Sequence, residues 1–198
     1  MKRSLVIAVL FVAVACRNES SSTQQPTSDT QAASQSTASS ATTPATASYD
    51  LQFIDTMSKH HLAAIEMARM AQSKVQLPEL KALTKRIPSD QQKEIDQMKV
   101  WRDQWYPGAP PVENMNMPGM SASMNMDMSH LQTMKPGRDY DVMFIDMMVP
   151  HHEGAVQMSK DALTRAKHQE LKKLAQQIID EQTKEIADMK QWKAKLTR

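Results

Sequence analysis

Histidine pairs and methionines are the side chains of this 198-residue chain with the clearest chemical potential. Two pairs, His60-His61 and His151-His152, each stand among methionines, and the chain holds 17 Met, far more than a core needs as flexible filler. Thioether sulfur is a soft ligand that suits Cu(I), and imidazole tolerates both oxidation states of copper. Thioether also escapes the disulfide formation that removes thiols outside the cytoplasm. The residue types therefore favour copper binding.

The two histidine pairs belong to an internal repeat. The segment YDLQFID at 49–55 returns as YDVMFID at 140–146, a shift of 91 residues that continues without a gap to Trp101 and Trp192. Self-similarity at one fixed spacing is typical of like structural units that stack on each other. We therefore expect two equivalent units that pack with approximate two-fold symmetry.

Each repeat has the pattern of two helices. Apolar residues recur at helical spacing from Phe53 to Val75 and again from Leu80 to Trp101. A turn is expected near Leu77, where Pro78 suits the first turn of a new helix, and its counterpart near His168. Short turns make consecutive helices antiparallel. The sequence predicts an all-α protein, an antiparallel four-helix bundle made of two repeated helical hairpins.

The spacing from each turn predicts which polar residues share a depth in the bundle. Counted from Leu77, His60 and Glu94 lie equally far away, and helices that rise equally per residue place them at one level. Buried imidazole and carboxylate need partners, and a metal ion is one such partner. An ion pair and ordinary core packing are the alternatives. The candidate metal ligands are Met57, His60, His61, Met67, Glu94, Met98, Met148, His151, His152, Met158, Glu185 and Met189.

A second group of candidate ligands lies between the repeats, in a stretch with the Pro, Gly, Ser and Asn of a loop. Packing in a core does not explain so many methionines in a polar loop, and exposed methionine is prone to oxidation. Alternating Met-x-Met spacing lets a flexible loop wrap several sulfurs around one soft ion. A low-complexity linker or a sticky surface is the alternative interpretation. The accessory ligands are Met115, Met117, Met120, Met124, Met126, Met128 and His130.

The N-terminus has the pattern of an export signal. A basic start precedes an apolar run that is too short to span a bilayer, and residues 1–15 are expected to be a signal peptide. Ala13-Val14-Ala15-Cys16 resembles a bacterial lipobox, which predicts lipidation of Cys16; ordinary cleavage with a free thiol is the alternative. The rest of residues 16–48 is a Ser/Thr/Ala-rich segment expected to be a disordered tether. We expect an exported lipoprotein on the periplasmic face of the cell envelope.

The remaining boundaries follow the repeat, with a first hairpin over 49–106, a Met-rich linker over 107–138 and a second hairpin over 139–198. A net charge of +2 gives no strong field for nucleic acid. The expected partners are a metal ion, a membrane only through the lipid anchor, and a protein that donates or accepts copper.

The segment FIDMMVPHHEGAVQM at 144–158 resembles the motif of the ferritin-like family called domain of unknown function 305, which includes periplasmic copper-binding proteins. The resemblance covers about 49–196 and implies a ferritin-like four-helix bundle and, for the copper-binding members, sequestration of Cu(I). It places the motif ligands at Met148, His151, His152 and Met158, and in the first repeat at Met57, His60, His61 and Met67. In the first repeat, Lys59 replaces Pro150, and Leu62-Ala63 replace Glu153-Gly154.

These patterns favour a binding protein that sequesters or shuttles copper, chiefly Cu(I) with Ag(I) as a mimic, in copper homeostasis or resistance. A dinuclear oxidase or peroxidase of the ferritin-like kind is one alternative, although no Glu here is followed by His three residues later, as in di-iron bundles. A structural or interaction module without metal is the other. No nucleophile motif or phosphate loop is present, so we expect no enzyme.

Overall fold

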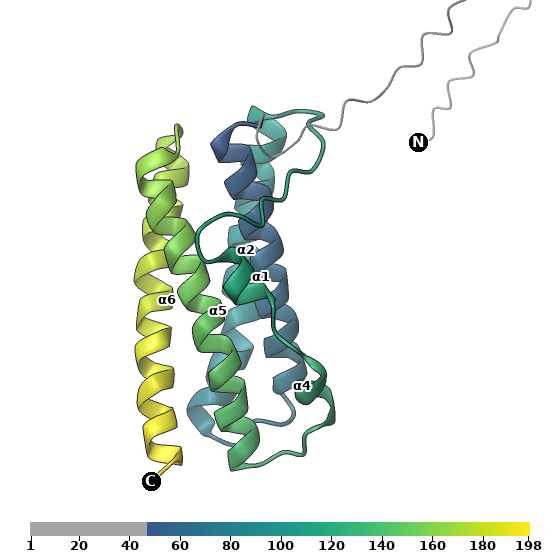
Figure 1. Cartoon of the computed structure of the whole chain (residues 1–198), viewed down its shortest axis with the longest axis vertical. Helices are drawn as coiled ribbons and strands as arrows, with labels where there is room; N and C mark the ends of the chain where they lie inside the picture. Colours follow the sequence, from purple (N-terminus) through teal and green to yellow (C-terminus); the bar gives the residue numbers. More distant parts are fainter. Residues whose placement is uncertain (1–46) are drawn as a thin grey trace, which may run out of the picture. The chain divides into compact units, whose positions relative to one another are not determined.

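The computed structural model describes residues 47–198, all helix and loop without a strand (Figure 1). The helices are α1 (Tyr49–Ala71), α2 (Pro78–Trp105), α3 (Met120–Met124), α4 (Ser129–Thr133), α5 (Arg138–Arg165) and α6 (Gln169–Leu196). The predicted all-α class is confirmed. The expected signal peptide, the lipidation site at Cys16 and the tether over 16–48 lie outside the described residues, apart from Ala47 and Ser48. Within 47–198, no helix combines the length and apolar character needed to cross a bilayer.

The four long helices form two neighbouring pairs. α1 packs against α2, α5 packs against α6, and α1 and α5 pack against each other to join the pairs. Within each pair the two helices run in opposite directions (Figure 1). Ser48 caps α1 by accepting a hydrogen bond from the backbone of Leu51 at 3.3 Å. Pro78 stands at the first position of α2, where its missing N–H costs no helical hydrogen bond.

Each repeat caps a turn of the other. The buried carboxylate of Asp50 on α1 accepts hydrogen bonds from the backbone N–H groups of Lys167 and His168, just before α6. The equivalent residue on α5, Asp141, accepts 2.8 Å bonds from the N–H groups of Gln76 and Leu77, just before α2. A carboxylate at a helix N-terminus satisfies orphan donors and complements the helix dipole. This reciprocal capping fixes the depth of one repeat against the other.

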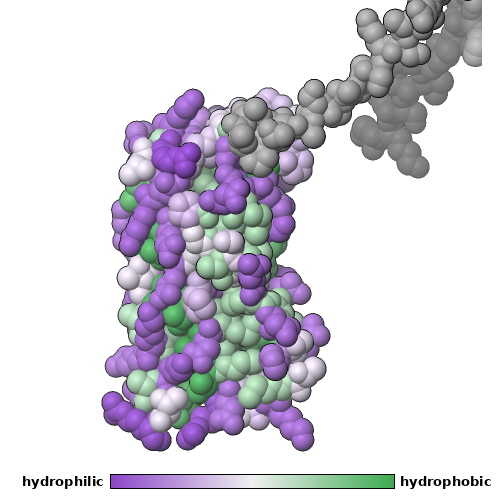
Figure 2. Space-filling model, in the orientation of Figure 1, coloured by the Kyte–Doolittle hydropathy of each residue, from purple (hydrophilic) through white to green (hydrophobic). Residues whose placement is uncertain are grey.

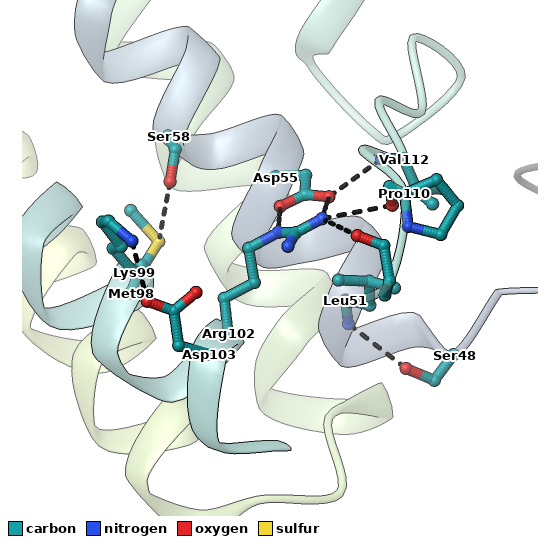
Figure 3. Close-up of polar contacts among 11 residues, drawn as sticks. Ser48, Leu51, Asp55, Ser58, Met98, Lys99, Arg102, Asp103, Pro110 and Val112 are labelled. Carbon is teal, nitrogen blue, oxygen red and sulfur yellow. Dashed lines mark hydrogen bonds and ion pairs between the residues drawn. The ribbon is translucent and has the colours of Figure 1, made fainter. Parts of the chain in front are cut away.

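The loop between α2 and α5 is tied to α1 at its start (Figure 3). Arg102 holds both carboxylate oxygens of Asp55, at 2.6 and 3.2 Å, and donates to the carbonyls of Ala109 and Pro110. The backbone N–H of Val112 donates to the same carboxylate of Asp55. Further along, Lys74 donates to the carbonyls of Leu131 and Met134. These bonds hold the loop, with α3 and α4, on the side of the helix pairs formed by α1 and α5.

The loop methionines are largely packed, and this corrects an expectation from sequence. Met117 and Met120 are buried in the core beside α1 and α5, and Met124, Met126 and Met128 are partly buried against it. Met115 is the exposed one, at 40%. The interpretation that core packing cannot explain loop methionine is therefore wrong for Met117 and Met120. Moderately hydrophobic side chains gather over the loop-covered face within a hydrophilic border (Figure 2).

Candidate metal centre

Four histidines form a fully buried layer between α1 and α5. His60 and His61 on α1, and His151 and His152 on α5, all have 0% exposure. The rings of His60 and His151 lie 3.7 Å apart between centroids, with an angle of 38° between their planes. Within each pair the centroids are 6.4 and 6.3 Å apart, so consecutive histidines point in different directions.

His61 and His152 point to carboxylates on the outer helices. Nε2 of His61 lies 2.7 Å from Oε2 of Glu94 on α2, and Nε2 of His152 lies 2.8 Å from Oε2 of Glu185 on α6. The carboxylate of Glu185 accepts a hydrogen bond from His152, which places the proton on Nε2 and leaves Nδ1 with a lone pair. The level predicted for Glu94 is right, but its contact is with His61 rather than His60.

His60 and His151 point instead to the loop. Nε2 of His60 lies 2.9 Å from Oγ of Ser123 on α3. Neither ring nitrogen of His151 has a hydrogen-bond partner, and Nδ1 of His60, His61 and His152 lacks one as well. A buried polar atom without a partner costs about 1–3 kcal/mol. Five nitrogens of the layer thus lack a partner, and two of them belong to His151.

Burial keeps the inner histidines neutral. Desolvation, together with the neighbouring imidazoles His61 and His152, holds the pKa of His60 well below its ordinary value. Burial and the facing ring of His60 do the same to the pKa of His151. Only neutral imidazole binds a metal, so both residues are ready ligands at neutral pH. Burial alone would raise the pKa of Glu185, but its bonds to His152 and Arg86 outweigh it and lower that pKa.

The six methionines predicted as ligands within the bundle are buried in two core clusters, and both repeats contribute residues to each cluster. Met57 and Met98 from the first repeat share one cluster with Met158 from the second. Met148 and Met189 from the second share the other cluster with Met67. Each cluster has methionines from two helices of one repeat and one helix of the other.

A pocket of about 210 Å³ lies where the loop crosses α1 and α5. Four thioethers and one imidazole line it, and we call it the methionine pocket; its residues are Ala63, Glu66, Met67, Ser123, Met124, Met126, Met128 and His151. The structure thus brings two predicted groups together, since Met67 and His151 are bundle residues and the other three sulfurs come from the loop. Met117 and Met120 belong to the core away from this pocket, and His130 is exposed.

Glycine at position 154 lets the loop approach α5. A Cβ added there would lie 2.5 Å from Cβ of Ser123 and 2.7 Å from the carbonyl of Gly119. Gly119 itself has φ +82° and stands before α3. The close contact positions Ser123 beside His60. Sequence reasoning missed Ser123 and Glu66, because irregular loop structure has no periodicity to read.

Oxygen and nitrogen donors alone do not form a cage here. Within residues 47–198, no group of three or more His, Cys, Asp or Glu side chains is arranged to hold a metal ion. The methionine pocket differs in kind, because its ligands are chiefly sulfur. One imidazole and several thioethers match the preferences of a soft monovalent ion.

Comparison with known proteins identifies relatives over most of the chain. The profile of the family described as "Domain of unknown function (DUF305)" matches residues 50–193. No curated protein matches the sequence. A DUF305 protein from Streptomyces coelicolor is 30% identical with TM-score 0.67, over 76% of this chain and 93% of its own.

Structures of CopM are more similar in sequence. The Cu(I)-bound form of CopM is 39% identical with TM-score 0.61, and the match covers 72% of this chain and 94% of CopM. The Cu(II)-bound form is 40% identical with TM-score 0.64, over 74% and 96%. The extent of the profile match and these identities confirm the resemblance seen in the histidine motif, and the chain belongs to the DUF305 family.

Proposed function

We propose that the chain is a copper-binding protein that sequesters or shuttles copper, chiefly Cu(I), outside the cytoplasm. The observation that carries this proposal is the methionine pocket, where four thioethers meet His151, whose two ring nitrogens lack partners. The site has ligands but no activated nucleophile beside it, and it acts by binding rather than by turnover. Its relatives include CopM, described in Cu(I)-, Cu(II)- and Ag-bound forms.

The ligand chemistry favours Cu(I) over harder ions in this pocket. Thioether sulfur is soft and uncharged, and it keeps its lone pairs at every physiological pH. The lowered pKa of His151 removes most of the competition from protons. The lining is chiefly sulfur and offers few of the oxygen ligands that a hard divalent ion needs. Ag(I) shares the softness and charge of Cu(I) and should bind in the same place.

The architecture proposed for this function is a ferritin-like four-helix bundle of two repeated hairpins, α1–α2 and α5–α6. The reciprocal capping by Asp50 and Asp141 supports it, because each repeat uses the same residue to hold the other. In such bundles, metal sites are built from side chains of facing helices. The facing rings of His60 and His151 occupy that central position.

The proposed location is the periplasmic face of the envelope, with a lipid at Cys16 as anchor and the segment to position 48 as tether. The basic and apolar start of the chain and its lipobox-like end support this location. The description of the Streptomyces coelicolor relative places it among secreted proteins. A protein that donates or accepts copper is the expected partner, and nucleic acid is not.

The test is an anaerobic titration of the mature protein with Cu(I) against a colorimetric chelator. We expect the triple variant M124L/M126L/M128L to weaken Cu(I) binding by at least about tenfold, since even outer-shell changes at metal sites cost 10–100-fold. The matched control M115L/M117L/M120L removes three sulfurs outside the methionine pocket and should bind as the wild type does. Leucine conserves most of the volume, so packing changes little. Wild-type protein that cannot compete for Cu(I) would overturn the proposal.

A further inference from the structure

A polar cleft separates α2 from α6, on the side of the helix pairs away from the loop. Its volume is about 400 Å³, and we call it the carboxylate cleft. The two helices that border it pack chiefly against α1 and α5 rather than against each other. Its lining comes from the middle of both helices, namely Arg86, Ile87, Asp90, Gln91, Glu94, Glu181, Gln182, Lys184 and Glu185.

The cleft carries an excess of negative charge. Four carboxylates line it against the two cationic side chains Arg86 and Lys184. Like charges held this close repel each other, and a bound cation would relieve that repulsion.

Two glutamines provide an independent indication of a ligand. Gln91 and Gln182, equivalent in the repeat, are only 5% and 4% exposed, and the amide oxygen of each lacks a hydrogen-bond partner. Both line the carboxylate cleft. An amide oxygen is an acceptor without a proton, so the group that satisfies it must be a donor or a cation. Two such atoms, related by symmetry and beside carboxylates, are suited to a hard or borderline metal ion.

We propose that the carboxylate cleft is a second metal site that takes a divalent cation, with Cu(II) as the copper species, through the carboxylates of Glu94 and Glu185 and the amide oxygens of Gln91 and Gln182. Water completes the coordination shell of the ion. The copper assignment rests on the proposed function, but the site does not use the methionine pocket.

The two sites contact different members of the histidine layer. His60 and His151 face the loop with its sulfurs, whereas His61 and His152 contact the two glutamates of the cleft. The soft sulfur ligands on the loop side favour Cu(I), and the oxygen ligands on the opposite side favour Cu(II). The molecule then binds Cu(I) beneath the loop and Cu(II) between α2 and α6.

Arg86 gives the site an asymmetry that can be tested. Its guanidinium bonds Oε1 of Glu185 at 2.9 Å, and the equivalent position in the second repeat is Gln177. An arginine beside a ligand carboxylate repels a cation and occupies one of its oxygens. The variant R86Q therefore removes the repulsion with a residue that the repeat already carries at the matching place.

The experiment compares Cu(II) and Cu(I) binding by the same set of mature proteins. We expect E94Q/E185Q to weaken Cu(II) binding by at least about tenfold, as loss of metal ligands does, and to leave Cu(I) affinity within about twofold of wild type because the sulfur ligands are untouched. R86Q should strengthen Cu(II) binding by about threefold or more. The control E79Q/E170Q removes two exposed carboxylates from the first turns of α2 and α6 and should change neither affinity.

An NMR measurement on the wild-type protein tests the second site even if a variant does not fold. Paramagnetic Cu(II) added to wild-type protein should broaden NMR signals of Gln91 and Gln182 before the methyl signals of Met124, Met126 and Met128. Broadening of the methionine methyls first, or unchanged Cu(II) affinity in folded E94Q/E185Q, would overturn the second site. Cu(I) binding with no Cu(II) binding refutes this inference alone, and loss of Cu(I) binding in wild type refutes the proposed function.

Discussion

The ring centroids of His60 and His151 lie 3.7 Å apart, with an angle of 38° between the ring planes. The two residues hold the same position in the repeat, one on α1 and one on α5. The contact therefore joins equivalent positions of the two repeats. Two imidazoles at this distance cannot both be positively charged without strong repulsion, so the metal-free layer depends on both rings being neutral.

That neutrality predicts acid sensitivity of the metal-free protein. The pKa values of His60 and His151 in the folded state are lowered well below 6.5, whereas the unfolded chain titrates near 6.5. Below pH 6.5 the unfolded chain binds protons that the folded chain does not, so the free energy of unfolding decreases as the pH is lowered. The slope is about 1.4 kcal/mol per pH unit for each histidine. Urea unfolding between pH 7.5 and 4.5 measures it.

The variant H151L provides the check on this assignment. It removes one of the two facing imidazoles and should reduce the acid slope by about half in this range. The control H130Q replaces an exposed histidine and should keep the wild-type slope. An acid slope that H151L leaves unchanged would show that other groups cause it.

A second prediction concerns the capping of one repeat by the other. Asp141 is 1% exposed and accepts two backbone N–H groups at the start of α2. The variant D141A leaves both donors buried without their acceptor, and we expect a loss of about 2–3 kcal/mol in the free energy of unfolding. Chemical denaturation measures the loss, and E79Q, which changes an exposed acid in the first turn of α2, should stay within about 0.5 kcal/mol of wild type. A comparably small loss for D141A would refute the capping role.

The sequence predicts those parts of the molecule that depend on regular spacing. The histidine motif identifies the family, and periodicity predicts the helical class. Equal counting from Leu77 places Glu94 at the histidine level, because every residue in a helix rises by the same amount. The count does not say which of two consecutive histidines makes the contact, since that depends on the rotation of α1 about its axis.

The contacts of the loop are outside the reach of that reasoning. Nothing periodic shows that Ser123 reaches His60 or that Met124 and Met126 meet His151 in one pocket. Their positions depend on the positive φ of Gly119 and on the missing side chain of Gly154, which act through steric fit. Counting places Glu94 at the histidine level but does not show a cleft between α2 and α6, because the cleft depends on how those two helices pack.

The close contact between Gly154 and the loop predicts the sign of the stability change caused by the variant G154A. In a helix interior, Gly→Ala normally stabilises a protein by about 1 kcal/mol. Here the new Cβ would stand 2.5 Å from Cβ of Ser123 and 2.7 Å from a backbone oxygen of Gly119, so α3 must move away. We expect G154A to lower the free energy of unfolding by about 1–3 kcal/mol, as overpacking does.

The same variant should also weaken Cu(I) binding, because α3 carries Ser123 and leads directly into Met124 and Met126. The double variant G154A/S123G removes the Cβ contact and should recover part of the lost stability, although the contact with Gly119 remains. Urea unfolding and the anaerobic Cu(I) titration measure the two effects side by side. A G154A protein more stable than wild type would mean that the loop does not seat on α5 at this glycine, and the methionine pocket would then lose its positioning contact.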